Sequence, residues 1–262
     1  MPTVPDYPTA FWFLACFSVV FVGIAKAGFG GGIAIIATPL IALAVPVVDA
    51  AAILLPLLIV CDVFAVIHYR NRFDRRSIKL LLPGSVLGIG VGAAFFGYFM
   101  DDERILQIGL GVLSVVFVLF QATRAVIFGA LARRRPHAAE GVAMGAVSGF
   151  TSTLAHAGGP PVAIHLLPQQ FPRDLYVGTT VIFFAVVNQI KLIPYFGLGL
   201  IQSGHLVTIA ILAPLSYVGV RLGIFLNRRF SEIWFNRVVY TMLLLTGIQL
   251  ILGKSLIAVV IG

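Results

Sequence analysis

Long apolar runs separated by short polar segments dominate the pattern along this 262-residue chain. Most of the runs are close to the roughly 20 residues that an apolar helix needs to cross a bilayer. They cover residues 10–25, 47–69, 77–98, 103–123, 141–155, 174–193, 205–226 and 233–253. The first and fifth are short, and a glycine-rich break and a further apolar stretch follow each of them. The pattern predicts an all-α integral membrane protein.

Composition and charge support this class. Hydrophobic residues make up 60% of the chain, charged residues make up only 11%, and the mean hydropathy is +1.04. The lysines and arginines behind the net charge of +8 lie almost wholly between the runs, where they fit a cytoplasmic membrane face better than nucleic acid. Cys16 and Cys61 fall within predicted spans, so we expect them to be packing residues. No basic residue precedes Lys26, so we expect the first run to remain in the mature protein.

The two halves of the chain resemble each other. The segments PGSVLGIGVG from Pro83 and PLSYVGVRLG from Pro214 share P-x-S-x-x-G-x-x-x-G at an offset of 131 residues. Offsets of 126 or 127 pair Pro46 with Pro172, Asp62 with Asn188, Tyr69 with Tyr195, Gly31 with Gly158 and Gly32 with Gly159. Internal repeats with interrupted segments in matching places are typical of secondary transporters. We expect a first repeat over residues 1–123, a basic cytoplasmic linker over 124–140 and a second repeat over 141–262.

The basic loops predict the orientation. The positive-inside rule places residues 70–79, 133–135 and 227–230 in the cytoplasm, and residues 101–104 and 196–204 outside. Residues 162–167 are too few to span, so the fifth run should return to its own side as a re-entrant hairpin bent at residues 157–161. By symmetry the first run bends at residues 28–32. Each half then has one hairpin and three spans, an odd number, so the repeats are inverted. Alternating access uses this parity. Both termini are then expected outside.

The glycine-rich breaks predict a binding site. Backbone amides at a helix break lose their partners, which a membrane protein tolerates only against protein or a water-filled cavity. Free N–H groups and the positive end of a helix dipole attract anions, and Lys26 adds a full charge about one turn away. Prolines remove two donors from the second break, so we expect the first hairpin to supply more hydrogen bonds. The predicted substrate-binding residues are Lys26, Gly28, Gly30, Gly31, Gly32, Thr153, His156, Gly158, Gly159, Pro160, Asn188 and Gln189.

Two of these segments carry a resemblance to a known family. KAGFGGGIAIIATPL in the first half and HAGGPPVAIHLL in the second resemble the paired signatures of the TauE/SafE family of anion exporters, and the likeness extends from about residue 12 to residue 253. The resemblance implies a fold of two inverted repeats. It also implies export of sulfite or of a small organosulfonate such as sulfoacetate.

Several polar residues within the runs have two interpretations. Asp62 either couples transport to protons or pairs with Lys26, or it makes only a hydrogen bond between helices. Lys26 either borders the site or extends its side chain to the outer surface. His156 either donates to an anion or is a buried histidine with satisfied hydrogen bonds. Asn188 and Gln189 either contact substrate or stabilise the structure.

Two acidic residues near the starts of runs are given a structural role. Asp49 and Asp174 each come shortly after a proline and before an apolar stretch. Such a position favours a helix N-cap, where a carboxylate accepts hydrogen bonds from free backbone amides.

The leading hypothesis is therefore a secondary anion transporter of the inner, or plasma, membrane of a bacterial-type cell, without cofactor or metal. Its expected partners are a small anion and the lipid bilayer, with a homodimer as the working expectation. One alternative is a lipid pyrophosphate phosphatase-like enzyme, which needs clustered carboxylates and an arginine. Another is a cation or metal carrier, which needs several buried carboxylates or thiolates. The sequence places only Asp62 clearly within a span and so favours neither alternative.

Overall fold

The structure is a computed structural model that describes residues 7–29, 34–131, 136–227 and 232–253. Within these ranges every regular element is a helix, which confirms the all-α class. The helices of the first half are α1 (Thr9–Phe29), η1 (Ala34–Ile36), α2 (Ala37–Ile41), α3 (Val47–Tyr69), α4 (Arg75–Phe99) and α5 (Glu103–Leu131). Those of the second half are α6 (Ala138–Ala155), α7 (Gly159–Leu166), η2 (Leu167–Gln169), α8 (Arg173–Gly197), α9 (Ser203–Asn227) and α10 (Glu232–Leu252).

Six of these helices are long and apolar enough to cross a membrane, namely α1, α3, α4, α5, α8 and α9. An apolar stretch in α10, Val239–Leu252, is shorter. Large hydrophobic side chains project outward from several of them, including Phe13, Ile193 and Phe196, which are 63–76% exposed. Such a surface suits lipid rather than water. The prediction of a multi-pass membrane protein is confirmed. The expected linker, however, is partly helical, since α5 continues to Leu131 and α6 begins at Ala138.

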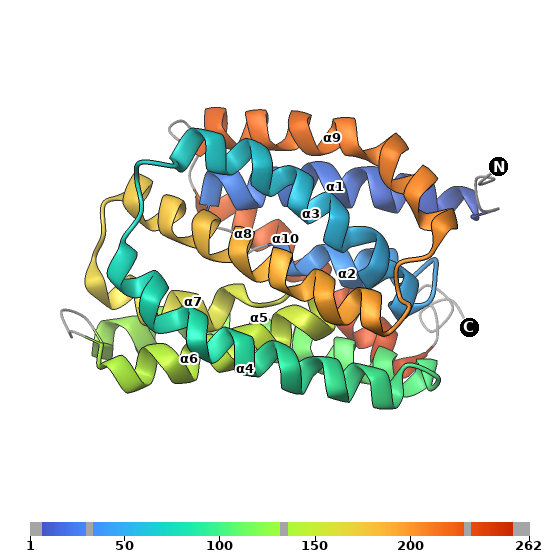
Figure 1. The fold of residues 1–262 in the computed structure, drawn as a ribbon, viewed down its shortest axis with the longest axis horizontal. Helices are drawn as coiled ribbons and strands as arrows, with labels where there is room; N and C mark the ends of the chain where they lie inside the picture. Colours follow the sequence, from blue (N-terminus) through green and yellow to red (C-terminus); the bar gives the residue numbers. More distant parts are fainter. Residues whose placement is uncertain (1–6, 30–33, 132–135, 228–231, 254–262) are drawn as a thin grey trace.

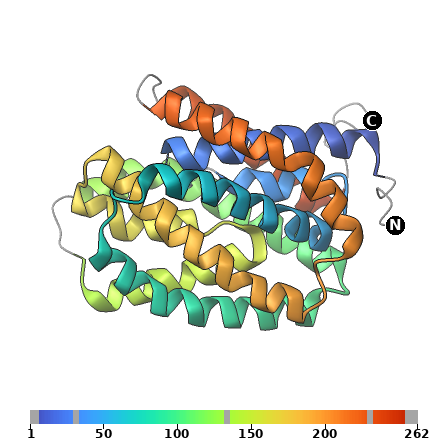
Figure 2. The ribbon, with the colours of Figure 1, turned by 45° about the horizontal axis from the view of Figure 1, so that its top comes forward.

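The helices pack in pairs around a central crossing. In Figures 1 and 2, α3 and α8 lie between a pair formed by α1 and α9 and a pair formed by α4 and α6. Helices α5 and α10 form another contacting pair. Each of the first two pairs therefore joins a helix of one half of the chain to a helix of the other half.

Glycines allow the paired helices to approach closely. A Cβ atom on Gly88 of α4 would lie only 1.9 Å from the carbonyl oxygen of Ala146 in α6. In the other pair, a Cβ atom on Gly219 of α9 would lie 2.5 Å from the carbonyl oxygen of Val20 in α1, and one on Gly223 would lie 2.6 Å from that of Ile24. Small residues have this role in membranes, where lipid gives no hydrophobic drive for helices to associate. These glycines of the repeated P-x-S-x-x-G-x-x-x-G pattern are thus packing residues.

Polar contacts identify which helix ends lie together. At one end of the bundle the backbone N–H of Val47 donates to Glu103 at 3.0 Å, and Arg104 donates to the carbonyl of Leu250 at 2.9 Å. This end also holds the start of α1 (Figure 1). At the opposite end the guanidinium of Arg173 lies 5.6 Å from the ring centre of Phe29. Helix α1 therefore begins and α10 ends at the same end of the molecule.

The second predicted hairpin is present. Helix α7 has only eight residues and runs back along α6, so that a Cβ atom on Gly141 near the start of α6 would lie 3.1 Å from the ring of His165. The hydroxyl of Ser148 donates to the carbonyl of Gly158 at 2.8 Å and holds the bend against α6. The bend of the first hairpin, at residues 30–33, lies outside the described residues.

The close approach of α4 and α6 generates a prediction about stability. Gly88→Ala should force the two helices apart, because overpacking of this kind costs about 1–3 kcal/mol, or roughly 2–4 °C of melting temperature per kcal/mol. The matched control is Gly90→Ala in the same helix, where a new Cβ atom meets nothing within 4 Å. Thermal unfolding in detergent measures both variants. Equal melting temperatures for the two would contradict the packing role of Gly88.

Candidate functional site

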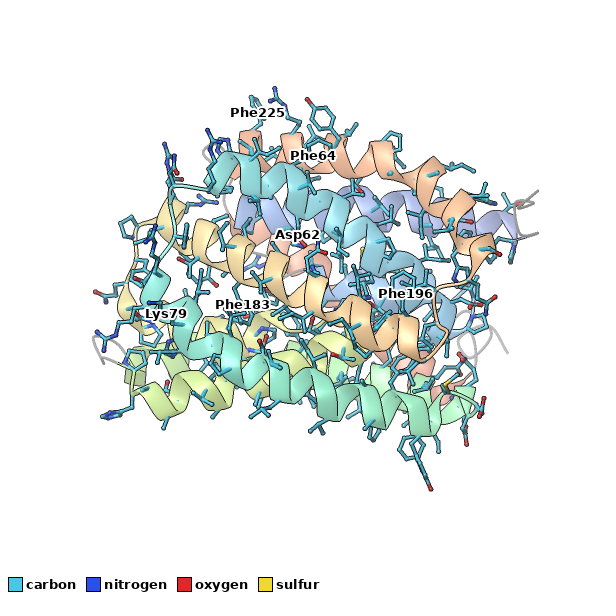
Figure 3. The ribbon with its side chains drawn as sticks, viewed as in Figure 1. Asp62, Phe64, Lys79, Phe183, Phe196 and Phe225 are labelled. Atoms are coloured by element: carbon cyan, nitrogen blue, oxygen red, sulfur yellow. The ribbon has the colours of Figure 1, made fainter. Side chains whose placement is uncertain are left out.

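The candidate site lies where α3 and α8 cross, near the centre of the molecule, as Figure 3 shows for Asp62. The amide nitrogen Nδ2 of Asn188 in α8 donates to Oδ2 of Asp62 in α3 at 2.8 Å. Both residues are buried, with 3% of Asp62 and 2% of Asn188 exposed. A carboxylate at such a place is costly unless a cation and hydrogen bonds compensate it.

Lys26 supplies the compensating charge. Its Nζ atom reaches from α1 to Oδ1 of Asp62 at 2.5 Å and donates to the carbonyl of Leu58 at 3.3 Å. Only 3% of Lys26 is exposed, so it does not extend to the outer surface. The hypothesis that Asp62 pairs with Lys26 is confirmed. The pair, together with Asn188, joins α1, α3 and α8 at one point.

A second buried lysine lies one turn along α8. Lys191 is completely buried, and its Nζ atom contacts three acceptors. These are the carbonyl oxygen of Ser152 at 2.8 Å, the hydroxyl of Ser152 at 3.1 Å and Nδ1 of His156 at 2.8 Å. The described part of the chain contains no carboxylate within ion-pair distance of Lys191. The centre thus holds two lysines and one carboxylate.

His156 ends α6 in an uncommon backbone conformation. Its φ of 53° and ψ of 28° are left-handed, a region that glycine adopts more readily than other residues at a helix end. The side chain explains the choice, since Nε2 lies 3.1 Å from the carbonyl oxygen of Ala51 while Nδ1 contacts Lys191. Because a carbonyl only accepts, Nε2 carries the proton and Nδ1 is free to accept from Lys191. His156 is therefore satisfied by hydrogen bonds, and it also borders the site.

A small cavity lies beside Lys26, His156 and Asn188. It has a volume of about 20 Å³ and is lined by Lys26, Leu58, Ser152, His156, Gly159, Phe184 and Asn188. A space of this size holds about one water molecule and no sulfonate group. The first hairpin contributes Lys26 to it and the second contributes His156 and Gly159. The hairpins also touch directly, because the hydroxyl of Thr38 in α2 donates to the carbonyl of Ala155 at 2.9 Å.

Two tyrosines support the helices that carry the site. The hydroxyl of Tyr69 in α3 donates to the carbonyl of Ala27 in α1 at 2.9 Å. The hydroxyl of Tyr195 in α8 donates to the carbonyl of Thr153 in α6 at 2.8 Å. Both bonds fix the end of a broken helix, next to Lys26 in one half and to Ser152 in the other.

Other predicted site residues lie apart from the cavity. Gly28 packs against α9, where a Cβ atom would lie 2.7 Å from the carbonyl oxygen of Gly223. Thr153 bonds back to the carbonyl of Gly149 at 2.9 Å, and Gln189 is exposed. Gly158 accepts from Ser148 at the bend, and Pro160 is partly exposed beside it. Gly30, Gly31 and Gly32 lie outside the described residues.

The N-cap hypothesis for Asp49 and Asp174 is wrong. Prolines occupy the cap positions of α3 and α8, and the two aspartates lie within the first turns. There Asp49 lies 3.4 Å from His205 at the start of α9, and Asp174 lies 2.6 Å from Arg72 ahead of α4. Each aspartate therefore makes a cross-link at one end of the bundle, in addition to a favourable interaction with the helix dipole.

Sequence reasoning missed Lys191. It lies within the predicted apolar run 174–193, and one charge hardly changes the hydropathy of a run of that length. A signal was available in its spacing, since residues three apart share one face of a helix and Asn188 was already a candidate. Gln189 is only one residue from Asn188 and two from Lys191, so it points from a different face of the helix.

Comparison with known families agrees with this geometry. Residues 15–250 match the model of the family described as sulfite exporter TauE/SafE. The chain belongs to this family. TauE/SafE proteins are membrane transporters rather than enzymes, which makes this TauE/SafE chain a transporter and removes the phosphatase-like alternative. Searches of the curated proteins and of the solved structures gave no significant match.

The Lys26–Asp62 pair generates a prediction about stability. Removing one partner leaves the other charge buried and uncompensated, which costs about 3–5 kcal/mol. Lys26→Met and Asp62→Asn should therefore each destabilise the protein strongly, while the double variant should lose clearly less than the sum of the two. Unfolding in detergent of the wild type and the three variants measures this cycle. Additive losses would show that the two side chains do not depend on each other.

Proposed function

We propose that the protein exports a small sulfur-containing anion, sulfite or an organosulfonate such as sulfoacetate, by alternating access through the cavity between α1, α3, α6 and α8. The observation that carries this proposal is the excess of buried lysines over carboxylates, with Lys26 and Lys191 against the single carboxylate of Asp62 in the described part of this centre. A cation carrier would need the opposite balance. When both lysines are protonated, an anion supplies the balancing charge.

The groups around the cavity suit an oxyanion. Lys26 and Asn188 line the cavity, and Lys191 lies behind two residues of its wall, Ser152 and His156. All three are hydrogen-bond donors, and donors with a full charge make the strongest bonds to oxyanions. Gly159 opens α7 at the cavity wall, where the positive end of the helix dipole favours negative charge. Two prolines follow at residues 160 and 161 and supply no N–H, so the side chains of Lys26 and Lys191 carry most of the recognition in our proposal.

The small volume of the cavity supports a transport cycle in which the site widens to admit substrate. About 20 Å³ is too little for a sulfonate, so the substrate can enter only if helices around the cavity move apart. Polar pairs close both ends of the bundle, Asp49 with His205 at one end and Arg72 with Asp174 at the other. The Arg72–Asp174 pair is exposed, and exposed pairs contribute only about 0–1 kcal/mol. Such contacts can open and re-form during a cycle at little cost.

Matching contacts support two inverted repeats as the basis of this cycle. The bond from Tyr69 to Ala27 recurs, 126 residues later, as the bond from Tyr195 to Thr153. Asp62 and Asn188, also 126 residues apart, touch each other, as equivalent residues do where a two-fold axis passes between them. Helix α4 packs on α6 in the way that α9 packs on α1. Inverted repeats give a transporter two states of similar energy that face opposite sides.

We also propose that both termini face outside, in the inner membrane of a bacterial-type cell. Basic residues such as Arg72, Arg75 and Arg76 lie at the end of the bundle opposite Asp101 and Asp102, which supports this orientation. In a variant without Cys16 and Cys61, a cysteine at the exposed position 101 should react with an impermeant thiol reagent on intact cells. A cysteine at the exposed position 76 should react only after lysis. The reverse pattern would invert the proposed topology.

Flux into proteoliposomes tests the function itself. Sulfite and organosulfonates should be transported, whereas phosphate and divalent metal ions should not. Lys26→Gln and Lys191→Gln should each reduce flux about 10- to 100-fold, because a hydrogen bond to a charged group contributes about 1.5–3 kcal/mol. Lys79→Gln, at an exposed position in α4, is the matched control and should transport normally. Transport of metal ions in place of sulfur anions would overturn the proposal.

A further inference from the structure

We propose that Lys191 takes up one proton from solvent when an anion binds beside it, so that the anion and a proton occupy the site together. This inference rests on the proposed anion transport and names its coupling residue. It assigns proton coupling to Lys191 of α8 rather than to Asp62, for which coupling was one of the interpretations open from the sequence.

Asp62 is poorly placed to couple transport to protons. Its carboxylate lies 2.5 Å from Nζ of Lys26, as an ion pair, and accepts a hydrogen bond from Asn188 at 2.8 Å. Both contacts favour the ionised carboxylate. The Lys26–Asp62 pair is neutral as a unit and needs neither a proton nor a substrate to remain so.

Lys191 is in the opposite situation. It is completely buried, and its three hydrogen-bond partners, two atoms of Ser152 and one of His156, are uncharged. The ring centre of Tyr195, one turn further along α8, lies 5.9 Å from Nζ. A buried ammonium without an anion costs several kcal/mol, and a protein avoids that cost by releasing the proton.

The charged and titratable groups around Lys191 come from each neighbouring element. Lys26 of α1 repels a charge on Lys191, and Asp62 of α3 attracts it but is already engaged by Lys26. His156 at the end of α6 and Tyr195 of α8 complete the surroundings. With Lys26 and Asp62 cancelling each other, the empty centre is close to neutral when Lys191 carries no proton.

The groups around Nζ of Lys191 can bond to it as an ammonium or as an amine without any movement of heavy atoms. As an ammonium it donates all three protons, to the carbonyl of Ser152, the hydroxyl of Ser152 and Nδ1 of His156. As an amine it donates to the carbonyl and to Nδ1, while the hydroxyl of Ser152 turns and donates to the lone pair on Nζ. A proton can therefore arrive and leave with only the rotation of one hydroxyl.

The cavity connects this proton site to the substrate. Ser152 and His156, which hold Lys191, both line the cavity, with Lys26 and Asn188 beside them. An anion bound there would contact side chains that bond to Nζ of Lys191, and its negative charge would favour an ammonium on that lysine. Coupling between two ligands of one protein is reciprocal. If a bound anion raises the affinity of Lys191 for a proton, a proton on Lys191 raises the affinity of the site for the anion by the same factor. A monoanion and its proton then enter and leave the site without a net change in charge.

Calorimetric titration of the purified full-length protein with methanesulfonate tests the inference. This monoanion has no group that titrates near neutral pH, so any proton taken up belongs to the protein. Titrations in tris and imidazole buffers, which differ in ionisation enthalpy and contain no sulfonate, give the number of protons per anion. We expect close to one proton for the wild type and for Lys79→Gln. The affinity for methanesulfonate should fall about tenfold for each unit rise in pH, over the range in which the loaded site holds the proton and the empty site does not.

Three variants identify the group that takes up the proton. Lys191→Arg keeps a permanent cation and should bind methanesulfonate without proton uptake. Lys191→Gln should bind at least tenfold more weakly, also without uptake. His156→Gln retains a donor and an acceptor but does not titrate, so the number of protons per bound anion should stay close to one even where its affinity for the anion falls. Loss of uptake in His156→Gln, with uptake retained in Lys191→Arg, would assign the proton to His156 and overturn our assignment.

The two proposals fail in distinguishable ways. Methanesulfonate binding to the wild type without proton uptake would overturn the coupling inference and leave anion transport intact. Failure of the wild type to bind methanesulfonate, sulfite or sulfoacetate would overturn the proposed function and this inference with it.

Discussion

The buried ion pair between Lys26 and Asp62 holds together the helices at the centre of the bundle. It joins α1 to α3, and through the hydrogen bond from Asn188 it joins both to α8. Lipid gives helices no hydrophobic reason to associate, so polar contacts of this kind help decide which helices meet. A buried pair is nevertheless a poor way to gain stability, because the cost of desolvation offsets most of the attraction. The pair lies beside a cavity lined by Lys26, and a second buried lysine, Lys191, lies behind the cavity wall. This place points to a functional role.

The arrangement around this pair combines firm and loose contacts. Helices α4 and α6, like α1 and α9, pack through glycines with almost no space between their backbones. Polar contacts also join the ends of the bundle, among them Asp49 with His205 and Arg72 with Asp174. In the proposed transport cycle, the tightly packed pairs would move as units while contacts at the ends of the bundle break and re-form.

Much of the fold was predictable from the sequence because the bilayer restricts it. Apolar runs of span length can only be helices in lipid, and the short run after residue 159 can only return to its own side. The glycine spacing in PGSVLGIGVG and PLSYVGVRLG predicted close packing, and the structure shows it. These features are local, and their meaning does not depend on which helix lies opposite.

The site was less predictable because it depends on which faces meet. Lys26, His156, Gly159 and Asn188 were identified from their places near breaks or within spans, and all four line the cavity. Lys191 was missed and Gln189 was included, although they are two residues apart in one helix. Hydropathy cannot distinguish the buried face of α8 from the exposed one. The partners of Asp49 and Asp174 come from distant segments, so their cross-links could not be seen in the sequence either.

In the proposed mechanism the anion binds in the cavity lined by Lys26, next to the buried Lys191. Selenite is the selenium analogue of sulfite, and anomalous scattering locates selenium in a crystal without ambiguity. Our account predicts one selenium peak in the cavity, about 3–4 Å from Nζ of Lys26 or Lys191, and its loss in the Lys26→Gln and Lys191→Gln variants. A selenium peak at another place, or one that persists in the cavity when both lysines are replaced, would contradict the account.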